Sequence, residues 1–258
     1  MIGNTTLFPV SHRNFHRPKI ATTPNQKSLR TVLTIADVTF FIFHFSFFTL
    51  AKRLLITSGP TREYLDPVRF LSNASSGKMG CALATAALKI GWEAVVVSGP
   101  VAVEYPPGIE LYPVVSTEEM YESALRLFPG CDIVIGAAAP CDYRPKNVSE
   151  KKLSKSDFSG ILELAETRDI LASLGQIKRS GQILVAFALE THDAQNRALQ
   201  KMRQKNADFI VVNSPAAIHA DETAFEVYDR AGAAVRSMNG SKKRLADQLL
   251  EMLIPHMK

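Results

Sequence analysis

RLLITSGP (residues 53–60) and EAVVVSGP (residues 93–100) are two apolar runs that each stop at Ser-Gly-Pro, and an alanine-rich stretch over about 78–90 separates them. The short apolar runs predict buried strands, and the alanine-rich stretch, which ends before Gly91, predicts a helix. A strand, a helix and a second strand in this order are typical of a parallel sheet covered by helices.

The same alternation continues to the end of the chain. Further strands are predicted over 109–115, 132–136, 183–187 and 209–213, further helices over 116–128, 168–179 and 193–205, and a polar loop over 141–160. Ser116 and Glu119 have capping-box spacing, Phe225–Tyr228 and Ala234–Ser237 predict a hairpin, and Ser241 is the expected cap of a last helix. We therefore expect an α/β fold: a Rossmann-like, doubly wound, mostly parallel sheet with a small β-hairpin extension. Ligands of such sheets bind beyond the carboxyl ends of the strands.

Composition narrows the class of protein. The 258 residues suffice for one large α/β domain, and the apolar fraction of 46% is ordinary for a soluble globular protein. Most of the net charge of +5 comes from residues 1–50, which have five basic residues and one acid. A nucleic-acid-binding domain carries its positive charge on the folded body, so we expect no nucleic-acid partner. Cys81, Cys131 and Cys141 have neither metal-ligand nor disulfide spacing, which favours a reducing cytoplasm.

Residues 1–50 differ from the rest of the chain. Residues 1–36 contain no Asp or Glu, and a phenylalanine-rich run, Val38–Leu50, follows. This run is shorter than the roughly 20 apolar residues of a membrane-spanning helix. Three interpretations compete: an organelle-targeting peptide, a membrane-surface anchor, and a poorly ordered or mis-started extension before a domain over 51–258. We expect the third, with no membrane partner, because the first clear strand begins only near Lys52.

The chemically richest segment is Arg69–Gly80 (RFLSNASSGKMG). Ser75, Ser76 and Gly77 at a helix start expose backbone N–H groups beside the positive end of the helix dipole, which predicts an anion site. Alternatively, one of the two serines only caps the helix. Neither this segment nor Ser58–Thr61 contains the glycine fingerprint of a dinucleotide-binding or P-loop site.

Three later segments also carry chemistry. Small residues in Gly136–Pro145 (GAAAPCDYRP) leave room for a ligand against the backbone, and Asp142 is either a ligand carboxylate or only a turn residue. Glu150–Lys155 (EKKLSK) is either a solvated charge run or part of a mobile lid. Lys201 and Lys205 lie i,i+4 on one predicted helix face, and they either hold a polyphosphate or are only solvated.

Taken together and in this order, these segments resemble the phosphopantothenoylcysteine synthetases from about Lys52 to the end of the chain. The most specific match is Asp66–Gly80 (DPVRFLSNASSGKMG), which is close to the bacterial form of the motif. Supporting matches are Val97–Pro100, Ala137–Pro145, Phe187–Thr191 (FALET), and Lys201 and Lys205 before Asp208–Asn213. In many bacteria this domain follows a flavin-dependent decarboxylase, which does not fit in residues 1–50. The resemblance therefore implies a stand-alone synthetase.

The resemblance also implies roles for individual residues. Asn73 is expected to contact the activated acyl intermediate, and Arg69 to reach across a dimer interface to the phosphate of phosphopantothenate. Lys152 matches the catalytic lysine of a flexible lid over 140–160. The nucleotide is expected at the matched positions Gly59, Ser75, Gly77, Gly80, Gly136, Ala137, Ala138, Asp142, Lys152, Arg168, Asp169, Ile170, Leu171, Phe187, Lys201 and Lys205. Ala138 and Asp142 are also expected to contact the acyl substrate.

Some positions depart from the family pattern. Pro60 replaces the second glycine of a Gly-Gly-Thr turn, which removes one backbone donor. Pro140-Cys141 replaces a Val-Ala pair, and Arg168 stands where proline is common. The lysine pattern of the lid is also altered, which leaves Lys151 as an alternative to Lys152.

The implied reaction has two steps. The carboxylate of 4′-phosphopantothenate attacks the α-phosphate of a nucleoside triphosphate and releases pyrophosphate, and the amine of L-cysteine then opens the acyl-nucleotide. The resemblance implies CTP rather than ATP, Mg²⁺ bound largely through phosphates and water with no metal ligands in the chain, and a cytoplasmic homodimer. The alternatives are a Rossmann-like NAD(P)-binding oxidoreductase, for which the sequence lacks a ribose-binding acid after the second strand, and a non-catalytic interaction module.

Overall fold

A computed structural model describes residues 51–156, 160–190, 192–213 and 222–257. The three interpretations of residues 1–50 lie outside these residues, as does Thr191 of the FALET segment. In the described part of the chain no helix is both long enough and apolar enough to cross a bilayer.

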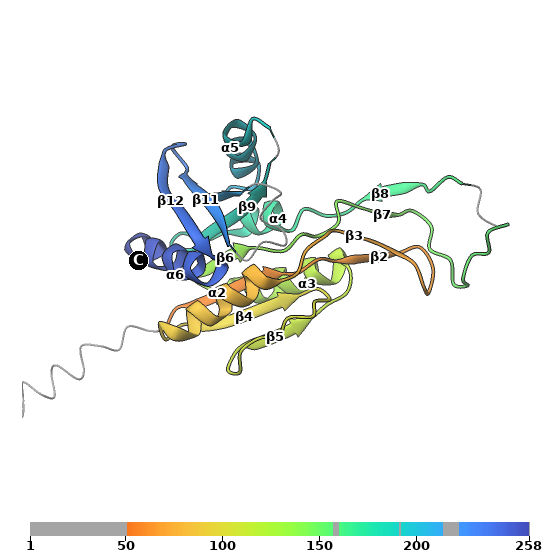
Figure 1. The fold of residues 1–258 in the computed structure, drawn as a ribbon, viewed down its shortest axis with the longest axis horizontal. Helices are drawn as coiled ribbons and strands as arrows, with labels where there is room; N and C mark the ends of the chain where they lie inside the picture. Colours follow the sequence, from red (N-terminus) through yellow and green to blue (C-terminus); the bar gives the residue numbers. More distant parts are fainter. Residues whose placement is uncertain (1–50, 157–159, 191, 214–221, 258) are drawn as a thin grey trace, which may run out of the picture. The chain divides into compact units, whose positions relative to one another are not determined.

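The main sheet of the described residues has eight strands in the order β12-β11-β10-β9-β6-β1-β4-β5 (Figure 1). These strands are β1 (Arg53–Ser58), β4 (Glu93–Ser98), β5 (Glu110–Pro113), β6 (Ile133–Gly136), β9 (Ile183–Leu189), β10 (Phe209–Asn213), β11 (Glu222–Asp229) and β12 (Ala234–Ser241). Six neighbouring strands pair in parallel, in the order β10, β9, β6, β1, β4 and β5. At the β10 edge, β11 and β12 are added by antiparallel pairing. The predicted mostly parallel sheet is confirmed.

Helices cover both faces of this sheet. Successive residues of a strand point to opposite sides, so each central strand contributes side chains to both layers of helices. α2 (Lys78–Lys89) and α6 (Lys242–Leu253) pack with Leu54 and Ile56 of β1. α3 (Thr117–Leu127), α4 (Ile170–Ile177) and α5 (Ala194–Gln204) pack with Leu55 in a second apolar cluster. All three β1 side chains are fully buried. β1 therefore lies at the centre of a doubly wound core. Truncating one of these side chains to alanine should lower the free energy of unfolding by about 2–5 kcal/mol.

Local signals in the sequence set several helix ends. The predicted capping box of α3 is confirmed, because Ser116 Oγ accepts a hydrogen bond from the Glu119 N–H at 3.2 Å and the Glu119 carboxylate accepts one from the Ser116 N–H. Ser241 caps α6 in the same way, with a backbone N–H at 3.3 Å. α4 begins two residues later than predicted, because Asp169 is its N-cap and accepts the Ala172 N–H at 3.0 Å.

The predicted hairpin is longer than the sequence suggested. β11 and β12 have eight residues each, and β11 pairs with β10, so the hairpin extends the main sheet. Phe225 and Val227 of β11 are buried in the cluster that also holds α6.

Two short antiparallel ribbons were not predicted. β2 (Arg62–Tyr64) pairs with β3 (Phe70–Ser72), and β7 (Tyr143–Pro145) pairs with β8 (Leu164–Glu166). The prediction of a polar loop over 141–160 is wrong for the residues of β7. This strand contains a proline and polar residues, so its sequence has no strand pattern, and it is defined only by its pairing with β8. The ribbons lie side by side and extend away from the main sheet (Figure 1).

The strand order places the candidate site. The chain runs from β1 to β4 and β5 on one side of β1, and then to β6 and β9 on its other side. The direction of winding therefore changes between β1 and β6. Ligands of open α/β sheets bind in the crevice outside the carboxyl ends of the strands at such a point.

Candidate active site

Two adjoining hollows lie beyond the carboxyl ends of β6 and β9. The first has a volume of about 500 Å³ and is bounded by residues 73–79 at the start of α2 and 137–139 after β6. The second has a volume of about 430 Å³ and is bounded by residues 140–143 and 166–171. Both are lined by Ala138, Asp142, Phe187 and Lys201. The two hollows therefore form one groove, which we call the central groove.

Most of the predicted site residues meet in the central groove. The first hollow is lined by Asn73, Ser75, Gly77, Ala137, Ala138, Asp142, Phe187 and Lys201. The second hollow is lined by Gly136, Ala138, Asp142, Arg168, Asp169, Ile170, Leu171, Phe187, Lys201 and Lys205. Gly59 and Gly80 line neither hollow, and Arg69 and Lys152 line a separate one.

Gly77 turns the chain into α2 at the wall of the first hollow. Its φ of 73° is left-handed, and a Cβ there would lie 2.7 Å from Val101 Cγ1, so only glycine fits without strain. The N-cap residue of α2 is Gly77, which has no side chain to cap the helix, and Ser76 Oγ accepts only a long hydrogen bond, at 3.5 Å, from the Lys78 N–H. This contradicts the alternative that a serine only caps the helix. The start of α2 therefore suits an anion, through its backbone N–H groups and its dipole.

Gly59 and Gly80 allow close packing behind this turn. A Cβ on Gly80 would lie 2.0 Å from Ser58 Oγ, and one on Gly59 would lie 2.6 Å from Val101 Cγ1. Ser58 is fully buried, and its hydroxyl accepts a hydrogen bond from the Tyr105 hydroxyl at 2.7 Å. These two glycines therefore bring β1 against α2 and its neighbours rather than forming the wall of the groove.

Asn73 bridges two segments of the first hollow. Its side-chain amide donates to the carbonyl of Pro140 at 2.8 Å and to that of Ala139 at 3.3 Å. The side chain is thereby held between the start of α2 and the loop after β6. A ligand in the first hollow therefore has an oriented amide beside it.

Lys201 and Lys205 each form an ion pair. Lys201 Nζ lies 2.6 Å from Glu190 Oε1, and Lys205 Nζ lies 2.6 Å from Asp169 Oδ2. The side chain of Glu190 is 4% exposed, whereas that of Asp169 is 51% exposed. Burial alone would raise the pKa of Glu190, but its contacts with Lys201 and Arg197 outweigh burial and lower the pKa below its usual value.

The two hollows differ in charge. The first is lined by three lysines, Lys78, Lys201 and Lys242, and by one carboxylate, Asp142. The second is lined by the cations Arg168, Lys201 and Lys205 and by the acids Asp142, Glu166 and Asp169. Cations therefore outnumber acids in the lining of the first hollow, although Lys201 is also paired with Glu190, and the lining of the second hollow has equal numbers of both.

Arg168 lines the second hollow, but its guanidinium contacts α3. Its Nη2 lies 2.5 Å from Glu118 Oε1, and its guanidinium carbon lies 4.4 Å from the centre of the Tyr121 ring. This cation–π contact and ion pair account for an arginine at the position where the family commonly has proline. The guanidinium of Arg168 is therefore directed to α3.

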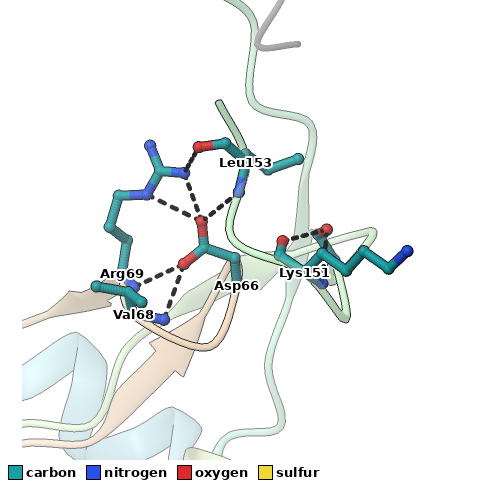
Figure 2. A network of polar contacts seen from close by, with 6 residues as sticks. Asp66, Val68, Arg69, Lys151 and Leu153 are labelled. Carbon is teal, nitrogen blue, oxygen red and sulfur yellow. Dashed lines mark hydrogen bonds and ion pairs between the residues drawn. The ribbon is translucent and has the colours of Figure 1, made fainter. Parts of the chain in front are cut away.

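Arg69 and Lys152 line a hollow of about 580 Å³ at the two ribbons. Asp66 organises this hollow: its carboxylate accepts the Arg69 Nε–H at 2.9 Å and the Leu153 N–H at 3.2 Å (Figure 2). The contact with Arg69 keeps the pKa of Asp66 well below its usual range. Lys152 lines the hollow, whereas the side chain of Lys151 extends away from Asp66 (Figure 2).

No residue lines both the ribbon hollow and the central groove. The predicted substrate and lid residues, Arg69 and Lys152, are thus brought together with each other but not with Asn73 or Lys201 in the described part of the chain.

Sequence reasoning missed one wall of the first hollow. Asn213, Thr223, Phe225 and Lys242, from β10, β11 and the start of α6, line it. The Phe225 ring meets the Phe187 ring edge to face, with centroids 5.6 Å apart. The only available signals were the alternation of β11 and the position of Lys242 directly after the cap of α6, and neither indicates a ligand.

Comparison with known proteins identifies the family of the chain. The family model of the DNA/pantothenate metabolism flavoprotein C-terminal domain matches residues 50–256. The coenzyme A biosynthesis bifunctional protein CoaBC of Bacillus subtilis (strain 168) is 48% identical over 163 residues, which are 63% of this chain and 40% of that protein. The chain spans about half the length, or less, of the curated relatives it matches.

Solved structures give the same result for the fold. The crystal structure of the C-terminal domain of CoaBC is similar at a TM-score of 0.67 and 38% identity, over 78% of this chain and 93% of that one. A Cab2 mutant in complex with phosphopantothenate-cysteine has a TM-score of 0.65 at 16% identity, over 86% of this chain and 91% of that one, which shows a shared fold. Since the family model covers nearly all of the described residues, the chain belongs to the family of the DNA/pantothenate metabolism flavoprotein C-terminal domain.

Proposed function

We propose that the chain is a phosphopantothenate–cysteine ligase, a phosphopantothenoylcysteine synthetase of coenzyme A biosynthesis. The observation that carries the proposal is the charge distribution of the central groove. A hollow with more cations than acids in its lining, beside Asn73 and the start of α2, continues into a hollow lined by equal numbers of both. A nucleoside triphosphate has the matching distribution, with a polyanion at one end and an uncharged polar nucleoside at the other.

The relatives support the substrate class. The CoaBC proteins are named for coenzyme A biosynthesis, and the fold neighbour Cab2 forms a complex with phosphopantothenate-cysteine. The match to the family includes the segment Asp66–Gly80, which supplies Asn73 and the start of α2.

The proposed chemistry needs activation of an acid. A carboxylate oxygen of 4′-phosphopantothenate attacks the α-phosphorus, a C–O–P anhydride forms, and the bond to pyrophosphate breaks. The amine of L-cysteine then attacks the acyl carbon, the amide forms, and the nucleoside monophosphate leaves with one oxygen of the original carboxylate. The chain supplies no nucleophile in this scheme. Its contribution is alignment of the reactants and stabilisation of the charge that develops on oxygen.

Individual residues serve these two needs. In the proposal, the start of α2 and Lys201 stabilise the negative charge of the leaving pyrophosphate, and Asn73 lies beside the acyl group. Asn73→Asp replaces an amide donor by a negative carboxylate next to an oxygen that gains charge when the amine attacks. We expect this variant to slow amide formation more than pyrophosphate release in single-turnover measurements. Equal losses in both steps would contradict the role of Asn73.

Magnesium fits the first hollow as a companion of the nucleotide. The hollow offers the Asp142 carboxylate, and among the described residues no group of three or more His, Cys, Asp or Glu could hold a metal ion. Such a site suits a cation held mainly by phosphate oxygens and water, with Asp142 as the available protein ligand. When bound, the cation would reduce the negative charge of the phosphates.

CTP is the proposed nucleotide. The segment Ser75–Gly80 follows the bacterial form of the family motif, which is associated with CTP, and ATP is the alternative. A competition assay decides between them. Release of labelled pyrophosphate from labelled CTP is measured, and we expect excess unlabelled CTP to suppress it and excess ATP to leave it unchanged.

A homodimer would complete the site. Arg69 and Lys152 lie in the ribbon hollow, apart from the groove in which the substrate they would contact is proposed to bind. The ribbons and the segments that join them also expose large apolar side chains, namely Val68, Phe70, Tyr143, Val148, Ile161 and Leu164. We propose that the ribbons pack against a second copy of the chain, so that each Arg69 serves the groove of the partner.

Mixing two inactive variants tests this arrangement. Arg69→Ala and Lys201→Met chains each lack one part of the proposed site. In a mixed dimer one of the two sites regains both residues, so equal mixing after subunit exchange should restore about a quarter of the wild-type activity. No recovery, with a dimer present in light scattering, would place Arg69 in the site of its own chain.

A reconstituted reaction tests the proposed function itself. The full chain is incubated with 4′-phosphopantothenate, L-cysteine, Mg²⁺ and CTP, and both pyrophosphate and the amide product are measured. We expect pyrophosphate only when phosphopantothenate is present, and amide only when cysteine is added as well. The oxidoreductase alternative predicts binding of NAD(P) and no pyrophosphate under any combination.

A further inference from the structure

Glu190 is a buried carboxylate at the carboxyl end of β9, one residue after the wall of the first hollow. Each of its oxygens meets one cation of α5: Oε2 lies 2.8 Å from Arg197 Nε, and Oε1 lies 2.6 Å from Lys201 Nζ. Its own N–H donates to the carbonyl of Asn213 at 3.2 Å, which ties the residue to β10. The backbone N–H and Oε2 of Glu190 are therefore hydrogen-bonded, whereas Oε1 has no hydrogen bond and is held by its ion pair with Lys201.

The two cations lie i,i+4 on one face of α5, so their side chains would repel each other without the carboxylate between them. Only one of them belongs to the central groove: Lys201 lines both hollows, and Arg197 lines neither. Glu190 thus connects a groove residue to a partner outside the groove.

The second lysine of the groove provides a contrast. Lys205 donates two hydrogen bonds to the carboxylate of Asp169, at 2.8 and 2.6 Å, but the side chain of Asp169 is half exposed, so water can replace the lysine as its partner. The pair between Lys201 and Glu190 is different, since the carboxylate is almost entirely buried and water cannot replace the lysine. Glu190 is therefore the acid that depends more on its lysine, because water cannot reach it.

We propose that Glu190 is a positioning residue, which acts through Lys201 by holding its ammonium group at the wall of the central groove, where the phosphates of the nucleotide bind. The role rests on the proposed function. It predicts that Lys201 keeps its contact with Glu190 when the nucleotide binds and shares its remaining donors with phosphate. The pair between Lys205 and Asp169, by contrast, opens to release Lys205.

Nucleotide affinity tests the proposal with a matched control. Glu190→Gln keeps the shape and removes the charge that orients Lys201, whereas Arg197→Gln removes the other cation and leaves the pair with Lys201 intact. We expect Glu190→Gln to weaken CTP binding about tenfold in equilibrium dialysis with Mg²⁺. Arg197→Gln should stay within about threefold of the wild type.

A double variant separates positioning from a structural role. In a Lys201→Met background, Glu190→Gln should cause no further loss of CTP affinity, because the group through which it acts is gone. Equal weakening by Glu190→Gln and Arg197→Gln, or a further loss in the Lys201→Met background, would overturn the proposal. The thermal midpoint of each variant shows whether the chain is folded.

Chemical labelling of the protein alone keeps this inference distinguishable from the proposed function. Brief acetylation should modify Lys201 several-fold faster in Glu190→Gln and leave the rate of Lys205 unchanged. In Asp169→Asn the rate of Lys205 should rise and that of Lys201 should stay unchanged. Unchanged labelling of Lys201 would overturn the inference whether or not CTP binds. If the labelling follows this pattern while the wild type binds neither CTP nor ATP, the ion pair stands, and the proposed function fails together with the positioning role.

Discussion

Gly80→Ala tests the packing that brings β1 against the start of α2. A methyl group on Gly80 would lie 2.0 Å from Ser58 Oγ and 2.4 Å from Ser58 Cβ, and Ser58 is fully buried. Overpacking of this kind costs about 1–3 kcal/mol. Alanine is also the better helix former by about 1 kcal/mol, which offsets part of the cost. Because the contact is far shorter than van der Waals distance, we expect a net loss of about 1–2 kcal/mol in the free energy of unfolding.

A second background reverses the sign of this effect. Ser58→Gly removes the two atoms nearest to the new methyl group, and the next nearest, the Ser58 Cα, lies at an ordinary contact distance of 3.4 Å. In this background Gly80→Ala should stabilise the chain by up to about 1 kcal/mol, through helix propensity alone. Urea unfolding of the four chains measures the difference. As a control, Gly130→Ala should not destabilise the chain, because nothing lies within 4 Å of its added methyl group. An equal cost of Gly80→Ala in both backgrounds would refute the reasoning.

Two further predictions concern titrating groups. The contact with Arg69 lowers the pKa of Asp66. This contact therefore stabilises the fold fully above the ordinary Asp pKa, and the stabilisation is lost as the pH falls from there through the lowered value. The difference in urea midpoint between the wild type and Asp66→Asn should accordingly shrink below about pH 4. A difference that stays constant down to pH 3 would contradict this. Burial raises the pKa of the Cys131 thiol to about 11 and also raises that of Cys81. Because Cys131 is buried and Cys81 is partly exposed, iodoacetamide at pH 8 should leave Cys131 unmodified in the native protein while it modifies Cys81, as read by mass spectrometry. Comparable modification of both thiols would show that Cys131 is accessible.

Much of the fold could be predicted because it depends on local patterns. The runs at 53–57 and 93–97 are short, apolar and bounded by Ser-Gly-Pro, and both are strands of the sheet. The caps Ser116 and Ser241 lie where residue type and spacing indicate. The ribbons could not be found in this way, because β7 is defined only by its pairing with β8, about twenty residues later in the chain.

The central groove was predictable to the extent that its residues belong to compact motifs. Asn73, Gly77 and Ala138 lie in such motifs and meet in the first hollow. Lys242 was not predictable, because its place in the groove follows from how α6 packs beside β11. The pair of Lys201 with Glu190 could not be predicted either, because the two residues lie eleven positions apart, one after the end of β9 and the other in α5.

The separation of Arg69 and Lys152 from the groove could not be inferred from sequence either. The resemblance assigns both residues by position, with Lys151 as the alternative to Lys152, but their place depends on hydrogen bonds between the segments 65–66 and 149–153. The Leu153 N–H donates to Asp66, and the Ser149 N–H donates to the Leu65 carbonyl at 2.9 Å. Neither contact has a sequence signature.

The fate of one carboxylate oxygen tests the central claim most directly. The full chain is supplied with 4′-phosphopantothenate labelled with ¹⁸O in its carboxylate, together with CTP, Mg²⁺ and L-cysteine, and the released nucleotide and phosphates are analysed by mass spectrometry. If the acid is activated on the α-phosphorus of a nucleotide held in the central groove, CMP acquires one labelled oxygen and pyrophosphate acquires none. Label in inorganic phosphate or pyrophosphate, or amide formed beside unlabelled CMP, would contradict the account.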